Sequence, residues 1–443
     1  MNKLRKVTSL ILAMSLSASV LAGCGNGSTE SQASQASQAQ ASSQAGGQVK
    51  LVWALWDKDK TTYYQPLIDA YKEKNPNVTI EMKDLGSTDY QTALGTQLAG
   101  GDSGLDIITV KDVPGYAAMT NAGQLEDLTQ YIKDNNIDLK KYGGITDQVT
   151  VDGKLYELPF RSDFWLLYYN KDLFDKAKVD YPTNDMTFEQ YDALARKLVS
   201  GSGNDKTYGA HYHTWRSAVQ LFGILDGKHT VLDYQDGYTW MKPYYEMVLK
   251  QQDDGVVMDY ATLKTSSTHY SGVFENSSVA MMNMGSWFIS TLMADNKAGK
   301  STAKNFGIVK YPHAEGVEPG STLATITGLA VASSSKNKEA ALDFVKFASG
   351  EEGAVVVAKT GTIPAIMSDD VIEFITSMEG FPTDPNSKEA LKTSHTYLEM
   401  PMNAKSAEVE TALNDDHDAI MTKSISIDEG LKKMSEDVKA ILG

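Results

Sequence analysis

An alternation of predicted strands and helices between residues 49 and 110 constrains the fold more than any other feature of the chain. Alternating apolar residues and dense apolar runs predict strands, whereas apolar residues at helical spacing predict helices. By these patterns the strands cover 49–56, 78–82 and 105–110, and the helices cover 63–74 and 90–99. The third strand is a dense apolar run of the kind that is buried on both faces of a parallel sheet. The order β-α-β-α-β predicts a doubly wound α/β lobe.

A similar pattern resumes after Gly153 and predicts a second α/β lobe that begins near Phe160. Thr187-Phe188-Glu189-Gln190 fits a capping box that opens a helix running to about Val199. Further strands are predicted at 164–169, 279–284, 306–309 and 329–332, with a helix at 338–348 and a mostly helical last hundred residues. About 395 residues follow position 48, more than one core usually serves, so two lobes are expected.

The N-terminal segment 1–23 has the layout of a secretory signal peptide. Three basic residues precede an apolar run over 7–20, which is too short for a comfortable transmembrane helix. Leu21-Ala22-Gly23-Cys24 resembles the bacterial lipobox, and this resemblance implies that the Cys24 thiol is diacylated and becomes the new N-terminus. Two acyl chains anchor stably where one would not. The alternative is a signal peptide that happens to end near a free thiol.

Residues 24–48 predict a lipidated cysteine followed by a disordered tether. After Cys24 the tract contains only Gly, Asn, Ser, Thr, Gln, Ala and one Glu, and nothing in it offsets the entropy of ordering. A coil of this composition has a root-mean-square reach of roughly 25–30 Å. We therefore expect a body held at the extracellular face of the cytoplasmic membrane, or on the periplasmic side in a cell with two membranes.

Bulk composition limits the function classes. The formal net charge is −16 at pH 7, which argues against nucleic acid as a partner. The single cysteine excludes an internal disulfide within one chain. Acidic balance would also suit a polyamine, although it is ordinary for a secreted protein.

The sequence contains no complete cofactor or metal motif. Asp57-Lys58-Asp59 is similar to the start of a calcium loop, but Thr62 stands at position six and Ile68 at position twelve. His211 and His213 lack a third His or Cys nearby in sequence, so no metal site is expected there. The glycines between 100 and 104 lack the Lys-Ser/Thr of a phosphate loop, and no Gly-x-Ser-x-Gly elbow occurs.

Several segments together resemble the extracellular solute-binding proteins of carbohydrate ABC importers, the family that includes maltose-binding protein. The matching stretches are Lys154-Leu155-Tyr156-Glu157-Leu158-Pro159, Leu167-Tyr168-Tyr169-Asn170-Lys171-Asp172-Leu173-Phe174, Val279-Ala280-Met281-Met282, Gly285-Ser286-Trp287, 340–347 and Thr360-Gly361-Thr362-Ile363-Pro364. Their order and spacing extend across nearly all of residues 49–443, and this arrangement carries the resemblance.

The resemblance implies two α/β lobes with a ligand cleft between them, a periplasmic-binding-protein-like fold in which the chain crosses three times. Carried onto this sequence, the crossings fall near 160–162, 276–278 and 325–327. Lobe one would then comprise 49–160 and 279–325, and lobe two would comprise 161–278 and 326–443.

A sugar site needs carboxylates or amides beside aromatic rings, because sugars offer hydroxyls and flat patches of C–H. Asp57 and Asp112 follow predicted strands, and ligands of open α/β sheets bind beyond the carboxyl ends of strands. The resemblance places an acidic sugar ligand at Asp163 when Tyr169-Asn170 is the anchor. Arg161 is a candidate beside it, and a purely structural Arg161–Asp163 interaction is the alternative.

Four tryptophans are candidates for stacking on a sugar. Ser286 and Trp287 lie just past a predicted strand, where the resemblance implies a stacking aromatic. Trp215 follows a segment predicted as a strand of lobe two. Trp165 and Trp56 are also candidates, although strand alternation could equally turn them into the core. Trp53 and Trp240 are expected to pack.

The leading interpretation is a non-enzymatic, monomeric receptor of an ABC importer. It would capture a sugar or oligosaccharide by closure of two lobes and deliver it to the transmembrane subunits of a permease. A lipid-anchored glycoside hydrolase is the alternative from another class, since its carboxylate pair also lies among aromatics. A third possibility keeps the receptor fold with a polyamine or peptide as cargo.

Overall fold

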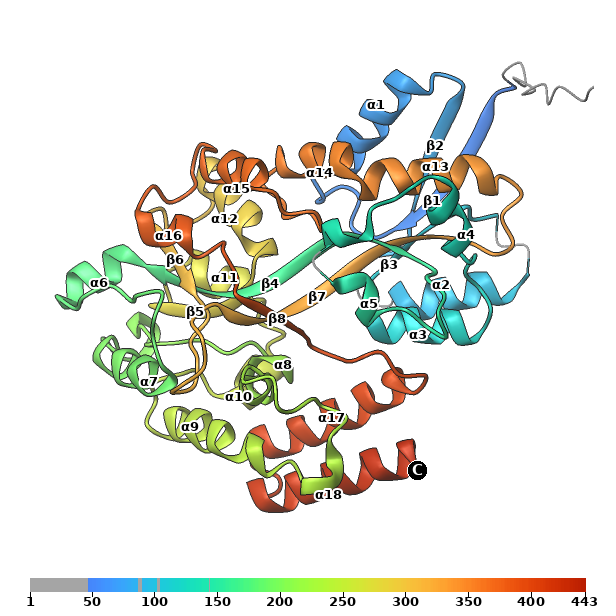
Figure 1. Ribbon diagram of the computed structural model, residues 1–443. Helices are drawn as coiled ribbons and strands as arrows, with labels where there is room; N and C mark the ends of the chain where they lie inside the picture. The colour runs from blue at the N-terminus through green and yellow to red at the C-terminus, as the bar shows by residue number, and fades with distance from the viewer. Residues whose placement is uncertain (1–46, 87–89, 102–103, 143) are drawn as a thin grey trace, which may run out of the picture. The chain divides into compact units, whose positions relative to one another are not determined.

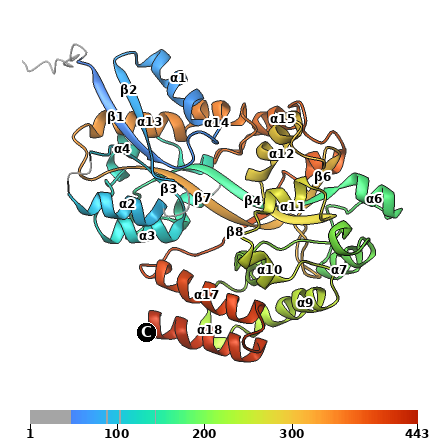
Figure 2. The same ribbon diagram turned by 180° about the vertical axis from the view of Figure 1, so that it is seen from behind.

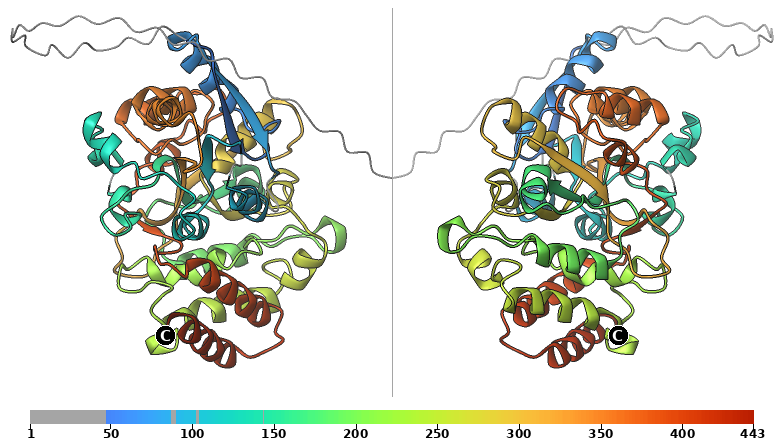
Figure 3. Two further views of the ribbon diagram at one scale, coloured as in Figure 1. Left: turned by 90° about the vertical axis from the view of Figure 1, so that its right-hand side faces the viewer. Right: turned by 90° about the vertical axis from the view of Figure 1, so that its left-hand side faces the viewer.

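The structure is a computed structural model that describes residues 47–443 except 87–89, 102–103 and 143 (Figures 1–3). Gly47–Gly443 form one compact unit. None of the helices in this described part has the length and apolar character needed to cross a membrane. Cys24, the predicted signal peptide and nearly all of the predicted tether lie outside the described residues, so their assignment stays a prediction.

The predicted β-α-β-α-β order is confirmed. Strands β1 (Val49–Leu55), β2 (Val78–Asp84) and β3 (Ile107–Val110) are parallel in the order β2-β1-β3. Helices α1 (Tyr64–Lys74) and α2 (Tyr90–Ala99) connect them. In Figure 2, α13 (Lys338–Ser349) lies on one face of this sheet, and α2 and α3 (Val113–Asn121) lie on the other. Only Lys111 and Asp112 separate the carboxyl end of β3 from the start of α3.

Two long strands carry the sheet from this α/β region into the rest of the molecule. They are β4 (Leu158–Asn170) and β7 (Ser321–Val331), which pair antiparallel with a register shift between Pro159 and Arg161. The C-terminal part of β7 lies between β3 and the N-terminal part of β4, giving the order β2-β1-β3-β7-β4-β5. Figure 1 shows both strands running through the middle of the described unit.

Three further strands extend the sheet beyond this middle. β5 (Met281–Gly285) and β6 (Phe306–Lys310) both pair antiparallel with the C-terminal part of β4, and β8 (His395–Leu398) pairs parallel with the start of β7. The strands predicted at 164–169, 279–284 and 306–309 are confirmed. The strand predicted at 329–332 is the end of a much longer one, and β8 was not predicted.

The capping box at Thr187 is present as predicted. The remaining helices pack around the sheet. They are α4 (Thr129–Asp134), α5 (Ile145–Gln148), α6 (Lys171–Ala177), α7 (Phe188–Lys197), α8 (Ser217–Gln220), α9 (Lys242–Asp253), α10 (Tyr260–Thr265), α11 (Tyr270–Glu275), α12 (Trp287–Lys297), α14 (Glu351–Ala358), α15 (Asp369–Thr376), α16 (Pro385–Glu389), α17 (Ser406–Met421) and α18 (Ile427–Leu442). Figures 1 and 3 show α17 and α18 side by side.

Hydrophobic packing groups residues 279–325 differently from the predicted lobes, and the lobe division itself stays a prediction. One cluster gathers residues of 51–160 and 326–357. Residues of 279–325 instead pack almost entirely in two other clusters, together with residues of 164–274 and 358–438. The physical reason is that β5 and β6 bond to the far part of β4, beyond the point where β4 leaves the first cluster. Along β7, Leu323 packs in the second cluster and Ile326 packs in the first, so the strand passes from one cluster to the other at Ala324–Ile326.

Candidate functional site

A cavity of about 640 Å³ lies where β4 and β7 pass from the first cluster to the others. Its size falls in the range of small-molecule sites. One side comes from Trp56 and α3, and the other from α17, the segment after β8 and three tryptophans. The lining residues that the argument uses are Trp56, Asp112, Arg161, Asp163, Trp165, Trp215, Arg216, Trp287, Glu399 and Glu410.

Arg161 and Asp163 form an ion pair on β4 at the cavity. Arg161 Nη2 donates to Asp163 Oδ2 at 2.7 Å, and Ser286 Oγ donates to Asp163 Oδ1 at 2.9 Å. Asp163 is 1% exposed, so both of its oxygens are engaged in a nearly dry place. Burial acts to lower the pKa of Arg161, but Asp163 and Tyr63 outweigh it and leave that pKa raised. Ser286 supports the pair from behind the cavity wall.

Asp112 is the N-cap of α3. Its Oδ1 accepts from the backbone N–H of Gly115 and from Gln91 Nε2, both at 2.8 Å. A carboxylate at this position also interacts favourably with the helix dipole. Burial nevertheless raises the pKa of Asp112. Both of these hydrogen bonds end on Oδ1, so in the part of the chain that the structure describes Oδ2 is the oxygen available to a ligand.

Three tryptophans form an edge-to-face cluster on one wall. The ring centroids of Trp165 lie 6.3 Å from Trp215 and 6.0 Å from Trp287, and those of Trp215 and Trp287 are 6.1 Å apart. Such packing fixes ring orientation. Trp215 is 37% exposed, which is unusual for a large apolar residue. Trp56 lies on the other wall with its ring edge against Tyr90.

Two expectations about candidate residues need correction. Asp57 does not line the cavity. It lies in a turn at φ +50°, and its carbonyl accepts hydrogen bonds from the backbone N–H groups of Lys60 and Thr61. Trp215 lines the cavity, but no strand precedes it. Residues 210–216 run without strand structure, and only an isolated bridge joins Tyr208 to Val279. The aromatic is presented by a loop and the start of α8.

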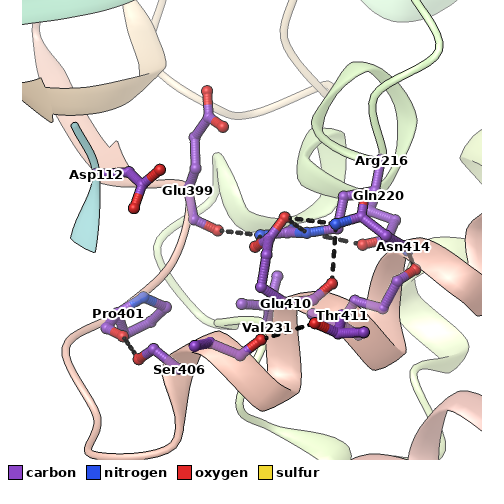
Figure 4. A network of polar contacts seen from close by, with 12 residues as sticks. Asp112, Arg216, Gln220, Val231, Glu399, Pro401, Ser406, Glu410, Thr411 and Asn414 are labelled. Carbon is purple, nitrogen blue, oxygen red and sulfur yellow. Dashed lines mark hydrogen bonds and ion pairs between the residues drawn. The ribbon is translucent and has the colours of Figure 1, made fainter. Parts of the chain in front are cut away.

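Sequence reasoning missed the C-terminal wall of the cavity. Arg216 Nε donates to Glu410 Oε1 at 2.9 Å, and Arg216 Nη2 donates to Glu410 Oε2 and, at 3.3 Å, to the carbonyl of Glu399 (Figure 4). Asn414 Nδ2 also donates to Glu410 Oε1 at 2.9 Å. Arg216 follows the candidate Trp215 in the sequence, but its partner Glu410 is 194 positions away and no local motif signals the pair.

Glu399 is the second carboxylate that sequence reasoning missed. It follows β8, lines the cavity and accepts a hydrogen bond from Trp165 Nε1. Burial raises its pKa to about 7, with Glu410 and Asp112 adding to the rise and Trp165 and Arg216 opposing it. Figure 4 shows the Asp112 carboxylate pointing toward Glu399. Two acidic groups from opposite walls therefore line the same cavity.

The histidines lie in a buried cluster next to the tryptophans. Burial lowers the pKa of His211 to about 3 and that of His213 to about 4. The His213 ring packs edge-on against Trp215 at 4.4 Å. Within the described residues no group of three His, Cys, Asp or Glu side chains could hold a metal ion. These neutral rings pack behind the aromatic wall.

The family profile described as bacterial extracellular solute-binding protein matches residues 56–355. The chain belongs to this family. The resemblance inferred from the sequence is confirmed, and so is the predicted fold class. The solute-binding protein is 56% identical to a structurally characterised sugar transporter from Rhizobium etli in an open conformation, with a TM-score of 0.79. That similarity covers 89% of this chain and 100% of the other.

Two curated relatives extend this comparison. The galactooligosaccharide-binding protein of Bacillus subtilis is 24% identical over 440 residues, covering 93% of this chain and 97% of its own. An uncharacterised ABC transporter extracellular-binding protein from Pyrococcus horikoshii is 30% identical over 150 residues. In that case the match spans only 32% of either chain. Both are described as binding proteins.

Proposed function

We propose that this solute-binding protein is a non-enzymatic receptor of an ABC importer and captures a sugar or oligosaccharide. The observation that carries the proposal is the cavity itself, where tryptophans from both walls stand beside charged pairs anchored on β4 and α17. Aromatic rings suit the C–H faces of a pyranose, and carboxylates and guanidinium groups suit its hydroxyls. Relatives with this fold include a sugar transporter and a galactooligosaccharide-binding protein.

Closure of two lobes would sequester the cargo. Strands β4 and β7 connect the first hydrophobic cluster to the others, so bending there would move the α3 wall against the α17 wall. A buried hydroxyl must find a partner, which gives selectivity against analogues with a misplaced group. Micromolar capture corresponds to about −8 kcal/mol, within reach of a few stacked rings and several hydrogen bonds.

The finer parts of the proposal rest on the sequence. Diacylation at Cys24 would anchor the protein to the membrane, and the tether after it would let the body reach the transmembrane subunits of the permease at the outer face. We propose that the receptor acts as a monomer. The anchoring step is tested by metabolic labelling with a fatty-acid analogue, which should be lost in Cys24→Ser.

A glycoside hydrolase is the competing function, because Asp112 and Glu399 line one cavity beside aromatics. Membership in a binding-protein family favours the receptor. The deciding experiment is a thermal-shift screen of the purified protein against mono- and oligosaccharides, with peptides and polyamines as controls, since a ligand of the folded state raises the melting temperature. A shift by one sugar class without its consumption supports the receptor. Turnover of the sugar contradicts it, and shifts by controls alone overturn the cargo.

A further inference from the structure

The charges that line the cavity do not balance. The described lining contains three cations, Lys111, Arg161 and Arg216, and four carboxylates, Asp112, Asp163, Glu399 and Glu410. Charges enclosed in a cavity act on each other and on a ligand more strongly than in bulk water. The lining has one more carboxylate than it has cations. We therefore expect its affinity for a ligand to depend on the ligand's charge.

Both arginines are already committed to carboxylates. Arg161 pairs with Asp163, and Arg216 holds Glu410 through two nitrogens. Arg161 also donates to Tyr63, and Arg216 to the carbonyl of Glu399. A ligand that withdrew either arginine would leave a buried carboxylate without its partner, which is costly. These two pairs therefore offer little attraction to an anionic ligand.

Asp112 and Glu399 are left with neutral donors. Asp112 accepts from Gln91 and from the Gly115 N–H, and Glu399 accepts from the Trp165 indole. Neither forms an ion pair within 4.0 Å with a Lys or Arg of the described chain. Lys111 Nζ lies over the Trp56 ring, 5.7 Å from its centroid, and lowers the pKa of Asp112 less than burial raises it.

The two carboxylates come from opposite walls. Asp112 begins α3 in the first cluster's region, whereas Glu399 follows β8 and is held by Trp165 of the tryptophan wall. Each also acts on the other, since the Asp112 charge raises the pKa of Glu399. A ligand enclosed between the walls would meet both groups, and a positive group there would relieve their repulsion.

Accepting the sugar cargo proposed above, we infer that the Asp112–Glu399 pair selects the cargo by charge, so that the site prefers a sugar bearing an ammonium group to its neutral and anionic counterparts. An ammonium group donates up to three hydrogen bonds and accepts none, which suits two carboxylates that line the same cavity. A uronate or sugar phosphate would add a like charge, which costs affinity and gives negative discrimination.

Calorimetric titration of the full chain with matched sugars tests the inference. The panel is glucose, glucosamine and glucuronate, the corresponding galactose series, and cellobiose beside the unacetylated glucosamine dimer. Glu399→Gln keeps an oxygen for the Trp165 indole and removes the charge, and Asp112→Asn keeps the helix cap. Glu379→Gln, at an exposed ion pair with Lys297, is the matched control.

We expect at least one ammonium sugar to bind tenfold or more tightly than its neutral partner, with no detectable uronate binding. The preference should fall to about onefold in Glu399→Gln and Asp112→Asn and persist in Glu379→Gln. Neutral sugars that bind as well as or better than ammonium sugars would overturn the inference and leave the proposed function standing. A preference unchanged in folded Glu399→Gln would overturn it too. Absence of all sugar binding would overturn both.

Discussion

The two charged pairs at the cavity differ in how the chain assembles them. Arg161 and Asp163 are two residues apart on one strand, and the pleat of β4 places them on one face. Arg216 and Glu410 are 194 positions apart, on α8's entrance and on α17. The strand pair is the drier of the two at its carboxylate, since the Asp163 side chain is 2% exposed and that of Glu410 is 30% exposed. The strand pair should therefore depend more strongly on its partner.

The largest expected effect is that of Arg161→Met. This change leaves the Asp163 carboxylate buried with only the Ser286 hydroxyl as donor, and breaking a buried pair in this way costs about 3–5 kcal/mol. Urea denaturation followed by circular dichroism measures it. The double variant Arg161→Met/Asp163→Leu should recover most of the loss. If Arg161→Met lowers the free energy of unfolding by less than about 1 kcal/mol, the pair is not shielded from water.

The different assembly of the two pairs also explains what sequence could predict. Local signals, such as the dense apolar run before Asp112 and the Gly-Ser-Trp at the end of β5, point to side chains at strand ends. The local pattern pointed to Asp112, whereas the family resemblance pointed to Asp163 and Trp287; the structure brings all three to one cavity. Glu399 lies among ordinary surface acids in sequence, and its surroundings depend on where α17 and β8 pack.

The fold shows the same limit. Elements of 49–110 could be predicted because short connections join neighbours along the chain. The long strand β7 was predicted only at its end, since Thr and Gly interrupt its apolar run. Asp57 was misplaced because a strand end alone does not say which way the following turn runs. The packing partners of 279–325 could not be predicted, because they depend on strand pairing with β4, which is a non-local feature.

A second comparison concerns two buried acids, Glu157 near the strand pair and Glu399 on the C-terminal wall. Burial raises the pKa of Glu157 to about 8, and a Cβ at Gly328 would lie 2.1 Å from its Oε2. The folded state keeps this proton up to about pH 8, whereas the unfolded chain loses it near its ordinary value of 4.5. The free energy of unfolding therefore falls as pH rises through this window, by an amount on the order of 5 kcal/mol.

Glu157→Gln should flatten this dependence, and Glu399→Gln should flatten it less because its pKa is raised only to about 7. Stability of each variant and of the native sequence is compared at half-unit steps from pH 5 to pH 8.5. Burial lowers the pKa values of His211 and His417 to about 3, so these residues make the free energy of unfolding rise with pH below pH 6.5. The quantity to compare is therefore the difference in the free energy of unfolding between each variant and the native sequence. Equal slopes in all three proteins would contradict an uncharged Glu157.

Arg216→Met should cost less than Arg161→Met, about 1–3 kcal/mol. Glu410 remains partly in water and keeps the Asn414 amide as a donor, so it tolerates the loss of its partner better than Asp163 does. The same urea titration measures this loss. If Arg216→Met proves the more costly of the two, the carboxylate's exposure is not what distinguishes the pairs, and the burial of Arg216 itself would be the cause.

The smallest effect on stability is expected for Trp215→Ala. Because Trp215 is 37% exposed and rests on Trp165 and Trp287 at their edges, its removal opens little cavity and should cost under about 1 kcal/mol. Trp165→Ala, at 1% exposure, should cost about 3–5 kcal/mol. If Trp215 stacks on cargo, its removal should weaken sugar binding about tenfold or more while the fold remains. An exposed ring that contributes to neither stability nor binding would remove the tryptophan wall from the site and leave recognition to the charged groups.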